Sequence, residues 1–142
     1  MARARSPLPA CSTALAAALA VTLAGCGTGD DQDQARATVQ QFAAALARGD
    51  GGAACSLLSE DLAQEIEQEE GKPCADAIGS LQVQPGAVDR VQVFITNAKA
   101  DLAGGRSAFL DRAADGWRLS ALACEPQGGK PADQPFDCEV QT

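Results

Sequence analysis

The hydrophobic period of this chain changes once, near its middle, and no other feature restricts the fold as strongly. In the first half, apolar residues such as Val39, Phe42 and Leu46 recur at the spacing of one helix face. In the second half, apolar and polar residues alternate, beginning with Val91 and Val93. Because the expected helices all precede the expected strands, the sequence predicts an α+β domain.

Glycine and proline divide the first half into four expected helices. Gly49-Asp50-Gly51-Gly52 ends the first helix after Arg48, and Ser59 can cap the third. Gly71-Lys72-Pro73 ends the third helix, and its proline can open the fourth. The inward positions of the second, third and fourth helices are, in order, Ala54, Cys55 and Leu58; Leu62 and Ile66; and Cys74, Ala77, Ile78 and Leu81.

Short turns separate four expected strands, over residues 88–96, 98–102, 106–112 and 117–123. Short connections between successive strands favour antiparallel pairing. On the last strand we expect one shared face for Trp117, Leu119, Ala121 and Ala123. The prediction is therefore an α+β fold in which N-terminal helices pack on a curved antiparallel sheet.

The first 26 residues have the organisation of an export signal. Arg3 and Arg5 precede an apolar run that reaches Leu23, and the string Leu-Ala-Gly-Cys ends at Cys26. The apolar run is shorter than the ~20 residues that a helix needs to cross a bilayer. A cysteine directly after Leu-Ala-Gly resembles the lipobox of bacterial lipoproteins, in which a peptidase cuts before the cysteine and a diacylglycerol is attached to its sulfur. The resemblance implies removal of residues 1–25 and lipidation of Cys26, with acyl chains such as palmitate.

The alternative to lipidation is an ordinary cleaved signal that ends at a cysteine by chance. A second string of similar type ends at Cys11, but Arg3 and Arg5 stand where an apolar segment should precede it, so Cys11 is expected to leave with the signal. Residues 26–34 then form the lipidated cysteine and a small, polar and acidic stretch, which predicts a flexible tether. Residues 35–142 form one domain.

The charge of the mature chain restricts its partners. Removal of residues 1–25 changes the formal net charge from −8 to −10, because Arg3 and Arg5 are lost and no acid lies there. Nucleic acid is a poor partner for such a domain, because phosphates are bound by Lys and Arg. Anionic headgroups repel it as well, so the attached lipid is the expected membrane contact. We therefore expect a lipid-anchored protein on the extracytoplasmic face of the cell membrane.

Four cysteines remain once Cys11 and Cys26 are set aside, namely Cys55, Cys74, Cys124 and Cys138. An even number of cysteines in an oxidising compartment favours disulfides. Of the three pairings that four cysteines allow, we expect Cys55–Cys74 and Cys124–Cys138, because each closes a loop of ~15–20 residues, worth about 3 kcal/mol in the chain-entropy model. Zinc is the alternative, but the chain has no His and no C-x-x-C pair, so no metal is expected.

Two strings in the expected domain carry a family resemblance. The first is Val39-x-x-Phe42-x-x-Ala45-Leu46-x-x-Gly49-Asp50, and the second is Asp115-Gly116-Trp117-Arg118-Leu119. They are similar to the first helix and last strand of nuclear-transport-factor-2-like cone folds. Together with the lipobox and two cysteine pairs, they resemble small lipoproteins of this type in high-GC Gram-positive bacteria. The resemblance implies a cone-shaped α+β domain with a C-terminal tail that a disulfide ties.

The resemblance leaves activity open, because this family includes ketosteroid isomerase, dehydratases, polyketide cyclases and members without activity. Its enzymatic members use Asp, His and Tyr in the cone pocket, and this chain has neither His nor Tyr. No nucleophile elbow, phosphate-binding loop or metal cluster occurs in the sequence. We therefore expect no catalytic residues and no cofactor, with an isomerase- or cyclase-like enzyme as the weakest alternative.

Two non-catalytic functions stay open. The domain can be a binding or accessory scaffold for an envelope protein partner, which requires an exposed apolar patch. It can also bind a small apolar ligand in a cone pocket lined by Phe42, Phe94 and Trp117, which requires a cavity of at least ~300 Å³. The same three aromatic residues are candidates for ordinary core positions.

Overall fold

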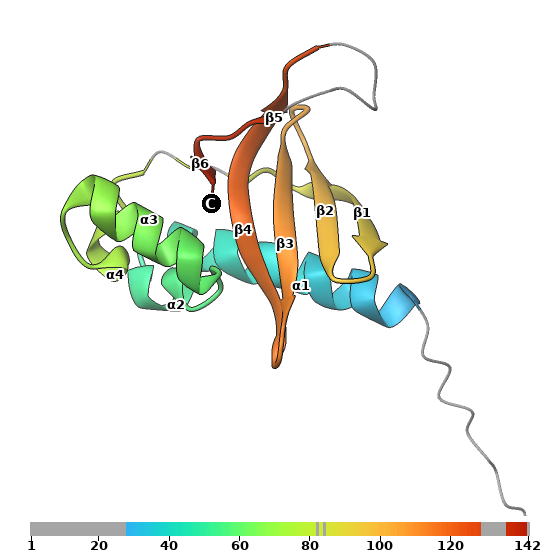
Figure 1. The fold of residues 1–142 in the computed structure, drawn as a ribbon, viewed down its shortest axis with the longest axis horizontal. Coiled ribbons are helices and arrows are strands. Elements are labelled where there is room, and N and C mark those ends of the chain that lie inside the picture. The colour runs from blue at the N-terminus through green and yellow to red at the C-terminus, as the bar shows by residue number, and fades with distance from the viewer. Residues whose placement is uncertain (1–27, 82, 84, 129–135, 142) are drawn as a thin grey trace, which may run out of the picture.

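The computed structural model describes residues 28–81, 83, 85–128 and 136–141 (Figure 1). Cys26, and with it the predicted cleavage and lipidation site, lies outside the described residues. The helices are α1 (Thr28–Ala47), α2 (Gly51–Cys55), α3 (Glu60–Glu70) and α4 (Cys74–Ala77). The strands are β1 (Val88–Phe94), β2 (Asn97–Leu102), β3 (Ser107–Ala113), β4 (Gly116–Pro126), β5 (Phe136–Asp137) and β6 (Val140–Gln141). The predicted α+β class, with helices followed by an antiparallel sheet, is confirmed.

The strands form one antiparallel sheet in the order β1-β2-β3-β4-β5, and β6 also pairs with β4. Helix α1 runs across one face of this sheet, and α2, α3 and α4 gather beside β4 (Figure 1). The core lies between α1 and the sheet and continues under α3. Its largest fully buried side chains are Trp117, Phe42, Leu62, Ile66, Ile78, Leu110, Leu119 and Leu122.

Side-chain caps set the starts of α2 and α3. The Oδ1 of Asp50 accepts a hydrogen bond from the Ala53 N–H at 2.9 Å, and the Oγ of Ser59 accepts one from the Leu62 N–H at 3.2 Å. The predicted cap at Ser59 is thus confirmed. Helix α4 is shorter than predicted and ends at Ala77. Its continuation is replaced by a turn in which both the N–H and the hydroxyl of Ser80 donate to the Ala77 carbonyl.

The predicted flexible tether is wrong for the part that the structure describes, because α1 already begins at Thr28. Two conditions favour helix here. Asp30 and Asp31 lie in the first turn, where negative charge interacts favourably with the helix dipole. In addition, Arg112 of β3 forms a 2.5 Å ion pair with Asp31. The acidic residues therefore belong to a helix end that is attached to the sheet.

Strand β4 departs from the simple alternation that was predicted. The register with β3 shifts twice, so β4 has an extra residue on each side of Ala121, and Ala123 has a φ of 52°. Trp117 and Leu119 remain on the core face, but Ala121 and Ala123 do not continue one unbroken face with them. From Leu119 to Cys124 every residue of β4 is buried, and β6 and β5 pair with this strand from Ala121 onward.

Both predicted disulfides are present. Cys55–Cys74 joins the end of α2 to the start of α4 with a Cα–Cα distance of 6.1 Å, and Cys124–Cys138 joins β4 to the residue after β5. The first bridge brings α2 and α4 into backbone contact. A Cβ on Gly51 would lie 1.9 Å from the carbonyl oxygen of Ala75, whereas a Cβ on Gly52 would meet nothing closer than 3.8 Å.

This contact gives a matched pair of glycine substitutions. Gly51→Ala should destabilise the oxidised domain by about 1–3 kcal/mol, because the added methyl group forces α2 and α4 apart. Gly52→Ala should be neutral or stabilising by up to about 1 kcal/mol, since alanine is the better helix former. Chemical denaturation of both variants measures the difference. Equal midpoints for the two variants would contradict the close approach of α2 and α4.

Candidate functional site

The three aromatic residues predicted to line a pocket or the core do not lie together. Phe42 and Trp117 are 0% and 1% exposed and belong to the core between α1 and the sheet. Phe94 is 57% exposed, so its assignment to a pocket or to the core is wrong. Successive side chains of a strand point to opposite faces, and after the register shift near Asp89 the buried Val91 and the half-buried Val93 face the core. Phe94 therefore points to the other face, at the end of the strand.

Trp117 is a core residue with one unusual atom. Its Nε1 is buried and has no hydrogen-bond partner among the described residues. The Arg112 guanidinium lies over the indole ring, 4.5 Å from its centre, and the same guanidinium forms the ion pair with Asp31. Trp117 thus supports, through Arg112, the attachment of the first turn of α1 to the sheet.

A groove of about 550 Å³, lined mostly by apolar residues, lies along α1. Ala43, Leu46 and Ala47 of α1 form one wall, and Ile78, Leu81 and Val83 form the other, on the segment that leads from α4 to β1. Its volume lies in the range of small-molecule sites. Neither Phe42 nor Trp117 is among its lining residues, so the groove is a different place from the predicted cone pocket.

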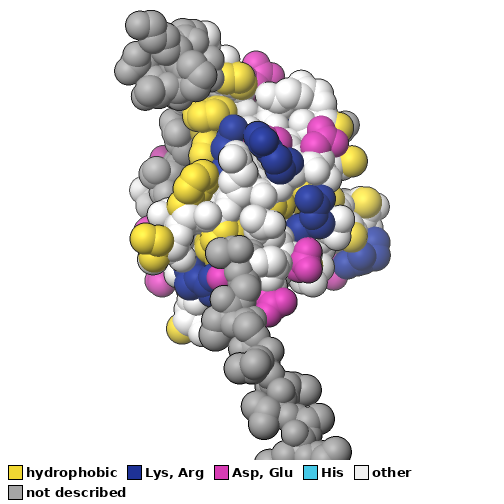
Figure 2. All heavy atoms as spheres, turned by 90° about the vertical axis from the view of Figure 1, so that its right-hand side faces the viewer, with side chains coloured by type: hydrophobic (Ala, Val, Ile, Leu, Met, Phe, Trp, Pro, Cys, Tyr) yellow, Lys and Arg dark blue, Asp and Glu magenta, His cyan; other side chains and the backbone are white. Residues whose placement is uncertain are grey.

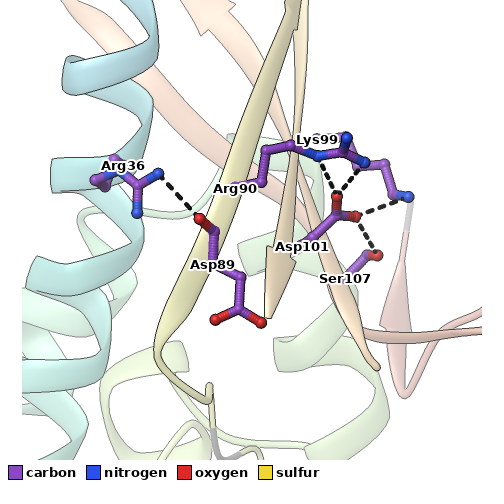
Figure 3. Close-up of polar contacts among 6 residues, drawn as sticks. All are labelled: Arg36, Asp89, Arg90, Lys99, Asp101 and Ser107. Atoms are coloured by element: carbon purple, nitrogen blue, oxygen red, sulfur yellow. Dashed lines mark hydrogen bonds and ion pairs between the residues drawn. The ribbon is translucent and has the colours of Figure 1, made fainter. Parts of the chain in front are cut away.

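A polar cluster surrounds Asp101 on the face of the sheet opposite α1 (Figure 3). Arg90 and Asp101 are cross-strand partners, and the Nε and one Nη of Arg90 donate to the same carboxylate oxygen at 3.1 and 3.0 Å. Lys99 approaches the other oxygen at 2.9 Å, and the Ser107 hydroxyl donates to it at 3.4 Å. At the edge of the sheet, Arg36 of α1 donates to the Val88 carbonyl at 2.7 Å.

The Asp101 cluster is poorly suited to general acid–base catalysis. Partial burial raises the pKa of Asp101, but hydrogen bonds and charges from Lys99 and Arg90 outweigh it and hold this pKa below its ordinary value of 3.8. A carboxylate with a lowered pKa is a weak general base. A cleft of about 280 Å³ lies beside it, where Lys99 sits over the ring of Phe136, 5.0 Å from its centre. We interpret the cluster as a connection among β1, β2, β3 and β5.

Within the described ranges, no group of three or more His, Cys, Asp or Glu side chains is arranged to hold a metal ion. The helices of the same residues include none that is long and apolar enough to cross a membrane. Comparison with family models, with curated proteins and with solved structures finds no match for the chain. The candidate site therefore has to be argued from the residues of this chain alone.

Sequence reasoning missed both the groove and the Asp101 cluster. The alternation of β2 does place Lys99 and Asp101 on the same outward face, as expected from the small residues between them. The partners Arg90 and Ser107 depend on the pairing register of three strands, which the sequence pattern does not show. The groove is formed by two segments more than thirty residues apart, and only the packing of α4 against the core brings them together.

Substitutions of Trp117 separate a core role from a pocket role. Trp117→Ala should destabilise the domain by about 3–5 kcal/mol, as loss of a large core aromatic does. Trp117→Phe should cost much less, because it keeps most of the packing and removes a buried donor whose lack of a partner costs about 1–3 kcal/mol. Denaturant unfolding of the oxidised variants measures both. A Trp117→Ala variant as stable as the wild type would show that this side chain lines open space.

Proposed function

We propose that this chain is a membrane-anchored extracytoplasmic lipoprotein whose domain binds or scaffolds and does not catalyse. One observation carries the proposal. The four cysteines of the described domain all form disulfides, in two pairs that staple separate parts of the fold. Structural disulfides persist in exported proteins and are rare in reducing compartments. The lipobox-like string that ends at Cys26 supplies a matching export and anchoring signal.

The domain is proposed to be of the nuclear-transport-factor-2-like type. The support is the order of helices followed by a curved antiparallel sheet, with the two resembling strings on α1 and at the start of β4. The proposal of a non-catalytic role rests on chemistry. The chain contains no His or Tyr. The carboxylate at the centre of the polar cluster, Asp101, forms ion pairs with Arg90 and Lys99. An accessory or binding role toward an envelope protein is what these features support.

The second candidate function is binding of a small apolar ligand, and the groove along α1 is the observation that favours it. The groove replaces the pocket between Phe42, Phe94 and Trp117 that the sequence suggested. Its walls combine Ala43 and Ala47, which leave room, with the larger Leu46 and Leu81, which supply apolar surface. Ligand sites of this size are mostly apolar and largely preformed.

The anchor is tested on Cys26. When the protein is expressed in its host with its own signal, detergent phase partitioning should recover it with the membrane. Intact-mass measurement should show a chain that starts at Cys26 and carries lipid. Cys26→Ala should abolish the lipid and either release the protein or leave it uncleaved. A soluble mature chain that starts at another residue would overturn the proposed anchor.

The groove is tested with an uncharged apolar fluorophore, N-phenyl-1-naphthylamine. Binding should raise its emission, and Ala43→Phe should weaken that binding roughly tenfold or more, because the added ring fills part of the groove. Ala44→Phe is the matched control, since Ala44 is the next residue of α1, is exposed and does not line the groove. An equal loss in both variants, or no binding to the wild type, would contradict the ligand-binding alternative.

A further inference from the structure

Two adjacent apolar side chains at the tip of the β1–β2 hairpin are exposed to an unusual degree. Phe94 is 57% exposed and Ile95 is 91% exposed, and they are the exposed large hydrophobic residues of the described chain. Isolated apolar residues at a surface are common, but two neighbours at the end of a projecting turn present a contiguous apolar tip. We call Phe94 and Ile95 the apolar tip.

The backbone of the tip does not favour the residue that stands there. Phe94 and Asn97 are cross-strand partners, so Ile95 and Thr96 form a two-residue turn, and Ile95 has a φ of 39°. The first central position of such a turn normally takes glycine when its φ is positive, and a β-branched residue there is strained. A strained position that keeps a large apolar side chain in solvent indicates that the side chain has a role outside the fold.

The apolar tip lies beside the start of α1, and specific contacts hold it there. The Thr96 carbonyl accepts a hydrogen bond from the backbone N–H of Arg112 at 2.8 Å, and the Arg112 side chain forms its 2.5 Å ion pair with Asp31. Asp31 lies in the first turn of α1. The tip and the first turn of α1 also appear on the same lower right side of Figure 1, whereas the β2–β3 turn lies at the top.

The start of α1 is also where the proposed lipid anchor attaches. Cys26 precedes Thr28 by two positions, so the Cα atoms of these residues are separated by at most about 7 Å. The contacts through Asp31 and Arg112 keep the tip near the first turn of α1, and so on the side of the domain where Cys26 is joined to it. With this short connection, the side of the domain that carries the start of α1 faces the membrane.

We propose that the apolar tip inserts Phe94 and Ile95 into the interfacial region of the bilayer, next to the lipid on Cys26. The inference rests on the proposed lipid anchor and deepens it, because it gives the domain a second membrane contact and a fixed orientation. Apolar side chains on an otherwise polar surface bind the boundary between headgroups and acyl chains in this way. The net charge suggested that the attached lipid is the sole membrane contact. The proposal adds the apolar tip as a second contact.

The charged groups around the tip are compatible with a lipid surface. Asp31 is paired with Arg112, and Asp111 accepts a hydrogen bond from the Asn97 side chain, whereas Asp30 in the first turn of α1 is exposed. Figure 2 views the molecule from the right-hand side of Figure 1, and it shows apolar side chains together with several Lys and Arg side chains and several Asp and Glu side chains on this face. Such a mixture suits the interface, where cations meet lipid phosphates and apolar groups meet acyl chains.

Tryptophan reporters in the full-length lipidated protein test the proposal. Phe94→Trp and Ile95→Trp each place a fluorophore on the tip, and the wild type, whose single tryptophan is the buried Trp117, supplies the background. The proteins are reconstituted into vesicles of phosphatidylcholine and phosphatidylglycerol with or without acyl-chain-brominated phosphatidylcholine. We expect a blue shift for both reporters and loss of their emission with the brominated lipid.

Ala103→Trp is the matched control. Ala103 is exposed in the β2–β3 turn, at the opposite end of β2 from the tip, so its reporter should keep a water-like emission and escape quenching. Equal quenching of the Ala103 and tip reporters would overturn the proposed orientation. A blue shift at the tip without lipid quenching would overturn the membrane contact and would indicate a protein partner or a second copy of the chain.

Two further measurements complete the test. Ile95→Gly should raise Tm, because glycine accepts the positive φ, and in the Phe94→Trp background it should reduce lipid quenching. Unchanged quenching in that double variant would show that Ile95 takes no part in the proposed contact.

The intact mass of each reconstituted protein separates the proposed lipid anchor from the proposed tip contact. Absence of lipid on Cys26 overturns the anchor and the tip together, whereas a lipidated protein with an unquenched tip overturns only the tip.

Discussion

Strand β4 is paired along both edges, and the rest of the fold depends on this pairing. Strand β3 occupies one edge. On the other edge, Leu119 exchanges backbone hydrogen bonds with Leu57 and Ser59, and β6 and β5 pair farther along. Three short pieces can share one edge because the two register shifts and the positive φ of Ala123 bend β4. The disulfides hold these pieces, since Cys124–Cys138 fixes the tail near β5 and Cys55–Cys74 fixes the helices next to Leu57.

The parts of the fold that could be predicted are those with local causes. Helix order, the cap at Ser59 and the antiparallel meander follow from period, capping and turn residues that lie within a few positions of one another. The disulfides were predictable because each closes a short loop. The bend of β4 and the full length of α1 were not predictable in this way. They depend on pairing partners and on an ion pair, Asp31 to Arg112, that joins residues eighty-one positions apart.

The same distinction applies to the candidate sites. Phe42 and Trp117 follow the helical and strand periods, and the structure buries both. The assignment of Phe94 to a pocket or to the core was wrong. An aromatic residue near the end of a strand fits the same sequence pattern whether or not other elements cover that face of the sheet. Coverage is a property of the whole sheet, since α1 occupies only one face and, on the other face, Phe136 of β5 packs beside Phe109 and Lys99, away from the end of β1. The groove and the Asp101 cluster likewise arise from segments that meet only in the folded chain.

The early start of α1 changes what a lipid on Cys26 would do. A flexible tether of nine residues would let any face of the domain approach the bilayer. A helix that begins at Thr28, and whose first turn is held to β3 by Arg112, transmits its orientation to the whole domain. Helix α1 has 20 residues and is about 30 Å long, and the apolar groove lies along its C-terminal half. With a lipid on Cys26, this geometry would direct the tip to the membrane and leave the groove open to the aqueous side, where a ligand or an envelope protein can reach it.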